Sequence, residues 1–93
     1  MPSYRRKPVD LVIDVRSRLE FWLGHLDGAV CIPVGKLANA MSKRADIGKD
    51  ARILVYCASG ARSAIAASAL TSLGYRRVTD AGAITQARQA YER

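Results

Sequence analysis

The sequence predicts an α/β fold: a small, mostly parallel sheet of four or five strands with helices on both faces. Short apolar, β-branched segments alternate along the chain with segments whose apolar residues recur at helical spacing. Such alternation implies crossover connections, which make neighbouring strands parallel and place helices over the sheet. The 93 residues are enough for one core and too few for two. We therefore expect one domain over residues 1–93, in which residues 1–8 form a flexible basic N-terminus.

The first half of the chain predicts two strands, each followed by a helix. VDLVIDV (9–15) is apolar and rich in branched residues, which is typical of a strand buried on both faces. GAVCIP (28–33) predicts a second short strand that its proline closes. Residues 17–25 and 34–44 carry apolar side chains at helical spacing, so each segment predicts a helix. The side chains expected to pack from these two helices are Leu19, Phe21, Trp22, Leu23, Val34, Leu37, Ala38 and Met41.

The second half repeats this order. ARILVYC (51–57) is the strongest strand pattern in the chain, and RRVTDA (76–81) predicts a short last strand. SAIAASALTSLGY (63–75) predicts a helix that ends near Gly74, and AITQARQAYER (83–93) predicts a terminal amphipathic helix. The apolar stripe expected on the first of these helices consists of Ile65, Ala69, Leu70 and Leu73.

The net charge of +7 favours anionic partners through long-range attraction. The cations are scattered over three clusters, at residues 5–7, 43–44 and 76–77. The same positive charge would attract a small anionic substrate, which does not require the cations to gather on one surface. We therefore expect no nucleic-acid partner. No apolar run approaches the length of a bilayer span, so we expect no membrane partner and a cytoplasmic monomer.

The two cysteines, Cys31 and Cys57, do not form a metal-ligand pattern. The chain has no CxxC pair, and its one histidine is His25. We therefore expect neither a metal nor a cofactor. Cys31 lies inside a predicted strand and is expected in the core, with a role as a resolving thiol less favoured. His25 is expected to stabilise a turn.

CASGAR (57–62) leaves the carboxyl end of the strongest strand, where open parallel sheets bind their ligands. Gly60 permits the positive φ that a tight turn into a helix requires. The unpaired N–H groups at the start of the following helix, together with Arg62, would make this turn electropositive. A cysteine in such surroundings has a lowered pKa and becomes a nucleophilic thiolate. Cys57 could instead be a small apolar residue that ends a buried strand, but the coincidence of these features favours the nucleophile.

Asp14 and Arg16 follow the first strand and are expected at the same edge of the sheet as Cys57. They could support the active-site loop through hydrogen bonds and charge pairing. The alternative is an ion pair on the surface at the end of the strand. A supporting role is favoured for Asp14, and both alternatives stay open for Arg16.

Two longer motifs resemble those of the single-domain rhodanese-like sulfurtransferases. CASGARS (57–63) is similar to the family's active-site loop, Cys-x-x-Gly-x-Arg-Ser. IDVRSRLEFWLGHLDGAVCIP (13–33) is similar to its early signature, in which Asp-Val-Arg is followed by Glu-Phe, by Gly-His-Ile-x-Gly-Ala and by Ile-Pro. Spacing and order agree over residues 12–82.

The resemblance implies a rhodanese-like fold and the transfer of a sulfane sulfur. Cys57 would take the outer sulfur of an anionic donor such as thiosulfate, hold it as a persulfide and pass it to cyanide, a thiol or a partner protein. Asp14 and Arg16 would support the site. The residues implied to bind the donor are Ala58, Ser59, Gly60, Ala61, Arg62 and Ser63.

Two other functions stay open. The domain could be a sulfur-relay or protein-interaction module with little activity on small donors, although such copies commonly lose the loop cysteine that this chain keeps. A cysteine phosphatase is less favoured, because its loop has five residues between cysteine and arginine, whereas four separate Cys57 from Arg62. Two departures from the rhodanese-like pattern are expected. The usual opening strand and helix before Asp-Val-Arg are missing, and AGAITQAR (81–88) stands where the family often has Gly-Gly and a following Trp.

Overall fold

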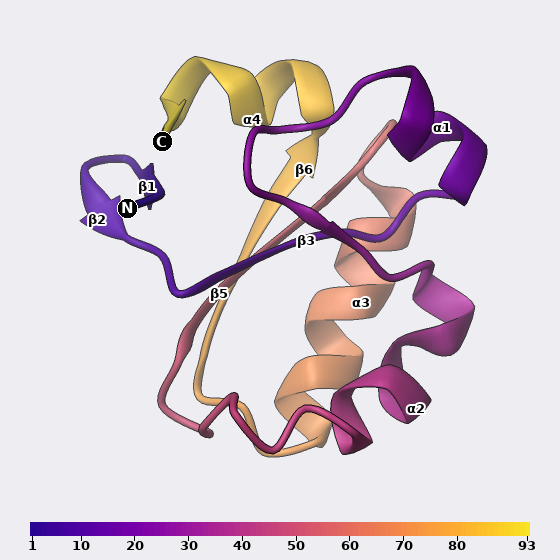
Figure 1. Ribbon diagram of the computed structural model, residues 1–93, viewed down its shortest axis with the longest axis vertical. Helices are drawn as coiled ribbons and strands as arrows, with labels where there is room; N and C mark the ends of the chain where they lie inside the picture. The colour runs from indigo at the N-terminus through magenta and orange to yellow at the C-terminus, as the bar shows by residue number, and fades with distance from the viewer.

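The computed structural model describes residues 1–93. Four parallel strands form the main sheet in the order β4-β3-β5-β6, and helices lie on both of its faces (Figure 1). The predicted α/β fold is therefore confirmed, with four strands. The strands are β3 (Leu11–Asp14), β4 (Val30–Cys31), β5 (Arg52–Cys57) and β6 (Arg77–Ala83).

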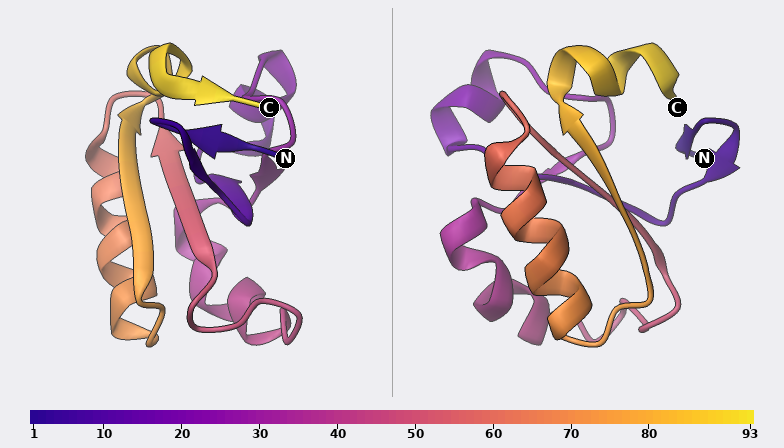
Figure 2. Two further views of the ribbon diagram at one scale, coloured as in Figure 1. Left: turned by 90° about the vertical axis from the view of Figure 1, so that its left-hand side faces the viewer. Right: turned by 180° about the vertical axis from the view of Figure 1, so that it is seen from behind.

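Each face of the sheet has its own core. Ile13 and Val55 point toward the face covered by α2 and α3, where Leu37 and Leu70 pack against them. Val12, Leu54 and Tyr56 point toward the opposite face, which α4 covers (Figure 2). None of the helices is long and apolar enough to cross a membrane. The helices are α1 (Arg18–Leu23), the 3₁₀ helix η1 (Val34–Lys36), α2 (Leu37–Ser42), α3 (Ala61–Ser72) and α4 (Ile84–Ala90).

A second, antiparallel sheet joins the two ends of the chain. Strands β1 (Ser3–Tyr4) and β2 (Lys7–Pro8) form a hairpin, and β1 also pairs with β7 (Tyr91–Glu92). Arg5 and Arg6 make the hairpin turn with positive φ angles of 51° and 66°. Residues 1–8, expected as a flexible terminus, thus have a defined place against the C-terminus, and β7 ends the predicted terminal helix at Ala90.

Helix α1 differs most from the sequence-based expectation. Leu19, Trp22 and Leu23 were expected to pack, but they are 65%, 79% and 72% exposed. The helix has six residues, none of them buried. It lies beyond the carboxyl edge of the sheet, next to the start of α3, and not over a face (Figure 1). The prediction of a packed apolar face on α1 was therefore wrong.

The buried face of α3 is also displaced from the predicted stripe. Ile65 is 61% exposed and Leu73 is exposed, whereas Ser63, Ala66 and Leu70 are buried. Leu70 was predicted correctly, but the small residues beside it let the helix approach the sheet closely, so this face cannot be recognised from Ile65 and Leu73. The helix ends near the predicted glycine, because Gly74 has a positive φ of 99° and the Tyr75 N–H bonds back to the Leu70 carbonyl.

Candidate active site

The predicted site lies where the connections of the sheet diverge. The chain leaves β3 toward β4 on one side, and it leaves β5 toward β6 on the other. In open parallel sheets this divergence opens a crevice beyond the carboxyl ends of the strands. Asp14 ends β3 and Cys57 ends β5, so the structure brings the predicted residues to one edge.

The turn after β5 wraps around the sulfur of Cys57. Gly60 has the left-handed φ of 103° that the sequence predicts for this turn, and its N–H donates to Cys57 Sγ at 2.9 Å. The Ser63 hydroxyl donates to the Gly60 carbonyl at 3.1 Å, which fixes the turn to the first turn of α3. The loop and the helix start thus form the expected cradle of N–H groups around one atom.

Hydrogen bonds outweigh burial at the sulfur. Burial raises the pKa of the Cys57 thiol, but the Ser63 hydroxyl and the N–H groups of Ser63, Gly60 and Ser59 lower it by more, so the net pKa lies below its ordinary value. The hydroxyl proton can turn from the Gly60 carbonyl to the sulfur. Donors that stabilise a thiolate in this way make a cysteine nucleophilic.

The sulfur lies deeper than expected. We expected Cys57 at the mouth of the cradle, but the residue is fully buried at the end of its strand. Ala58 and Ser59, which follow it in the loop, are exposed.

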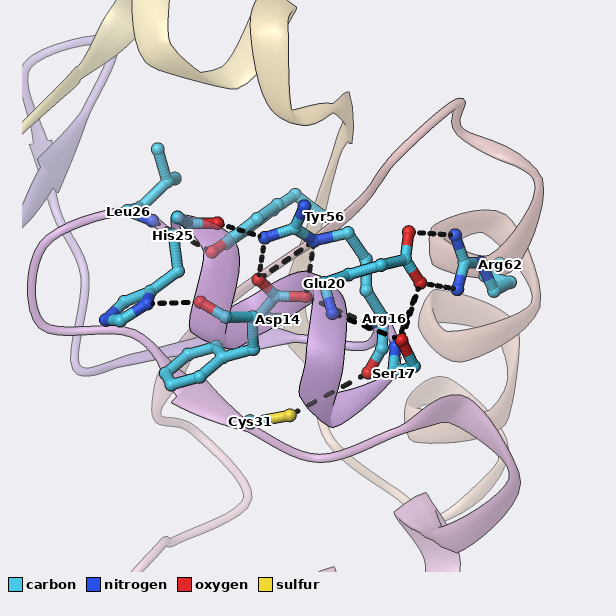
Figure 3. Close-up of polar contacts among 11 residues, drawn as sticks. Asp14, Arg16, Ser17, Glu20, His25, Leu26, Cys31, Tyr56 and Arg62 are labelled. Carbon is cyan, nitrogen blue, oxygen red and sulfur yellow. Dashed lines mark hydrogen bonds and ion pairs between the residues drawn. The ribbon is translucent and has the colours of Figure 1, made fainter.

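Arg62 does not point freely into the site. Its two terminal nitrogens donate to the two carboxylate oxygens of Glu20 on α1, at 2.7 and 3.0 Å (Figure 3). This pairing lowers the pKa of Glu20 to about 2.

The predicted donor-binding residues differ in burial. Ala58, Ser59 and Ala61 are exposed, Gly60 and Arg62 are half-buried and Ser63 is buried.

Glu20 is a site residue that the sequence interpretation missed. Its carboxylate also accepts hydrogen bonds from the N–H and hydroxyl of Ser17, whose oxygen in turn accepts from the Glu20 N–H. This reciprocal arrangement is a capping box, which fixes the start of α1. The spacing Ser-x-x-Glu could have revealed the cap, but not its partner Arg62, 42 residues away.

Asp14 and Arg16 form a buried network. The Asp14 carboxylate accepts from the backbone N–H of Arg16 at 2.9 Å and from its guanidinium at 2.7 to 3.0 Å. The same guanidinium donates to the Gly24 carbonyl after α1 and lies over the ring of Tyr56 (Figure 3). The alternative of a surface ion pair was therefore wrong. The pair links the end of β3 to the turn that follows α1.

Tyr56, which the sequence interpretation did not single out, extends this network. The ring is buried, and its hydroxyl accepts from the Leu26 N–H at 3.0 Å.

Two further residues from the sequence analysis lie near α1 and β4. His25 stacks on Phe21, and its Nδ1 lies 2.8 Å from the Phe21 carbonyl, which agrees with the expected role in a turn. Cys31 is half-buried and free, and burial raises the pKa of its thiol.

Comparison with known proteins decides the family. Residues 3–82 match the sequence model of the family described as "Rhodanese-like domain". The chain belongs to the rhodanese-like domain family. The matched range contains both Cys57 with its loop and the Asp14–Arg16 network.

Two relatives of this rhodanese-like domain carry different names. The chain is 37% identical over 78 residues to "Putative thiosulfate sulfurtransferase, mitochondrial" of Schizosaccharomyces pombe, covering 73% of this chain and 55% of that protein. It is 31% identical over 90 residues to tRNA uridine(34) hydroxylase of Erwinia tasmaniensis, covering 91% of this chain and 26% of that protein. The chain thus spans little more than half of the first relative and about a quarter of the second.

Solved structures agree with the family. The structure "rhodanese with anions" from Escherichia coli matches with a TM-score of 0.78 and 26% identity, over 89% of this chain and 96% of that chain. The human single-domain sulfurtransferase TSTD1 matches with a TM-score of 0.76 and 27% identity, over 85% of this chain and 80% of that chain. The rhodanese-like domain therefore has the fold of single-domain sulfurtransferases.

Proposed function

We propose that this rhodanese-like domain is a thiosulfate sulfurtransferase that carries a sulfane sulfur on Cys57. The observation that carries the proposal is the hydrogen-bonded sulfur itself, at the end of β5, with the Gly60 N–H at 2.9 Å and a lowered pKa. Family membership supports sulfur transfer as the class of reaction.

The reaction would proceed in two displacements. The Cys57 thiolate attacks the outer sulfur of thiosulfate, the new sulfur–sulfur bond forms as the old one breaks, and sulfite leaves with the bonding electron pair. The persulfide anion then occupies the cradle of N–H groups. An acceptor such as cyanide or a thiolate attacks the outer sulfur, and the thiolate of Cys57 is regenerated.

The anionic donor would be attracted mainly by backbone groups. Because Glu20 neutralises Arg62, the positive field at the sulfur comes from the loop N–H groups and from the start of α3, which has 12 residues. Arg62 would contribute directly to donor binding when its pair with Glu20 opens. The four-residue spacing between Cys57 and Arg62 suits a sulfane sulfur better than a tetrahedral phosphate.

A second candidate function is sulfur relay to a protein. Helix α1, which holds Arg62 through Glu20, exposes the apolar side chains of Leu19, Trp22 and Leu23 next to the loop. An acceptor protein that presents a thiol to Cys57 would cover this helix. The relatives named tRNA uridine(34) hydroxylase contain such a domain as about a quarter of their length.

The cytoplasmic location of this domain stays a prediction.

Thiocyanate formation from thiosulfate and cyanide tests the enzyme. We expect turnover by the wild type and none by Cys57→Ser, with Cys31→Ser as the control that removes the other thiol. A wild type that accepts one sulfur but forms no thiocyanate would support the relay. Turnover retained by Cys57→Ser would reject both candidates.

A further inference from the structure

The fold assembles cations that the sequence scatters. One cavity of about 320 Å³ is lined by five cations from distant parts of the chain. They are Arg5 and Lys7 of the N-terminal hairpin, Arg52 at the start of β5, Arg77 at the start of β6, and Arg76 just before it. Two of the three cationic clusters in the sequence thus meet in space, and Arg52 adds to them. We call this cavity with its five cations the basic cavity.

The basic cavity lies at the end of the sheet opposite Cys57. Arg52 and Cys57 are the first and last residues of β5, so they stand about 17 Å apart along the strand. Arg52 shares a sheet face with Leu54, which belongs to the core under α4. Figure 2 shows the hairpin β1–β2 on the face of the sheet that α4 also covers, while α4 itself lies near the carboxyl ends of the strands. The cavity is therefore separate from the candidate active site.

The protein leaves most of this positive charge unneutralised. Arg52 and Arg77 are direct neighbours in the register of β5 and β6, and like charges at such positions are destabilising. Arg76 pairs with Asp50, but none of the other four cations has an acidic partner. The nearby Asp10 carboxylate accepts from the backbone N–H of Arg52, not from its guanidinium.

The lining indicates what kind of anion would fit. Guanidinium groups bind phosphate through paired hydrogen bonds, and four of the five cations are arginines, two of them on the paired strands β5 and β6. Val9, Leu54 and Val78 add apolar surface, and the Tyr4 ring also lines the cavity, with Arg5 stacked over it at 5.5 Å. The volume is within the range of small-molecule sites. A ligand with several phosphates and an apolar or planar part matches this combination.

We propose that the basic cavity binds the phosphates of an organic polyphosphate, either a free nucleoside polyphosphate or a segment of RNA. Both sources carry phosphates next to a planar base, so the shared chemistry is the same. The proposal does not depend on sulfur transfer, because the cavity and Cys57 lie at opposite ends of β5.

The test is titration of the full chain with three probes: ATP, inorganic tripolyphosphate and a short single-stranded RNA. Calorimetry gives the affinity, and backbone amide shifts in an NMR spectrum locate the site. We expect saturable binding that shifts the amides of Arg52 and Arg77 and leaves those of residues 58–63 unchanged. ATP tighter than RNA would identify a free nucleotide, and RNA tighter than ATP would identify a nucleic acid; either result supports the phosphate site.

A matched pair of double variants tests whether the site is specific. Arg52→Gln/Arg77→Gln removes two cations of the basic cavity, and Lys36→Gln/Lys43→Gln removes two exposed cations outside it. We expect the first to weaken binding about tenfold or more, as for lost charge-assisted hydrogen bonds, and the second by less than about twofold. Arg5→Gln/Lys7→Gln, on the hairpin, should weaken binding as well.

Folding is checked in the same samples. Because removal of Arg52 and Arg77 relieves repulsion, the first double variant should unfold at an equal or higher denaturant concentration than the wild type. Equal weakening by both matched variants would mean that only net charge matters and would overturn the proposal. Absence of binding by all three probes, or shifts confined to residues 58–63, would overturn it as well.

Discussion

Glu20 and Arg62 hold each other through two parallel hydrogen bonds, across 42 residues of sequence. Glu20 belongs to the capping box that begins α1, and Arg62 lies in the first turn of α3, five residues after Cys57. One ion pair therefore ties the exposed helix α1 to the loop that surrounds the sulfur. The Glu20 carboxylate also offsets the positive charge that Arg62 would otherwise present to an anion at the sulfur.

The pair predicts opposite effects of two substitutions on donor use. In Glu20→Gln, Arg62 loses its charged partner and becomes available to an anion, so KM for thiosulfate should fall a few-fold. In Arg62→Ala, KM should rise about tenfold, because a charge-assisted contact is lost. Steady-state thiocyanate assays measure both. If both substitutions raise KM equally, Arg62 only positions α1 and does not bind the donor.

The same pair predicts a dependence of stability on acid pH. The pKa of Glu20 is lowered to about 2 in the folded protein, from about 4.3 in an unfolded chain. Its contribution is therefore complete above pH of about 4.3 and is lost as the pH falls toward 2. Urea unfolding at several pH values should show a smaller loss of stability on acidification for Glu20→Gln than for the wild type. Because both side chains are about a third exposed, the difference should be small. Identical acid profiles would contradict this assignment.

The hydrogen bonds around the sulfur predict a reactive thiolate. In a Cys31→Ser background, the rate of alkylation of Cys57 should follow a pKa below the ordinary value. Ser63→Ala removes the hydroxyl that favours the charged form, so the pKa should rise toward that of a free thiol. The pH dependence of iodoacetamide labelling, followed by mass spectrometry, measures both values. A Ser63→Ala profile that coincides with the parent would show that the hydroxyl does not act on the sulfur.

The buried pair of Asp14 and Arg16 predicts a large structural cost for its removal. Asp14→Asn leaves the Arg16 guanidinium buried without a counter-charge, which should lower the free energy of unfolding by about 3–5 kcal/mol. Asp46→Asn breaks an exposed pair with Arg44 and should leave unfolding unchanged. Urea denaturation compares the two variants. Equal small effects would mean that the Asp14–Arg16 network is not structural.

Local chemistry made part of this molecule predictable. The strands 9–15 and 51–57 are nearly continuous apolar runs, so their burial on both faces follows from composition. The turn after β5 was predictable because Gly60 and the start of α3 determine where the N–H groups point. The positions of Cys57 and Asp14 at one edge followed from the parallel order of the strands.

Relations between distant segments were not predictable in the same way. Apolar spacing shows which side of a helix is apolar, but not whether the helix lies over a sheet or beyond its edge. Trp22 was therefore predicted to pack, although its side chain is exposed. The partner of Arg62 is on another helix, and no spacing rule reaches it. The basic cavity forms where the N-terminal hairpin, which pairs with the C-terminus, lies against the main sheet. Strands of two residues have no recognisable sequence pattern, so this pairing could not be predicted.

The most direct test of sulfur transfer is the mass of the intact protein after incubation with thiosulfate. We predict that the wild type and Cys31→Ser gain one sulfur atom, that cyanide removes it, and that Cys57→Ser gains none. An unmodified wild type, or equal addition to Cys57→Ser, would contradict the assignment of Cys57 as the sulfur carrier.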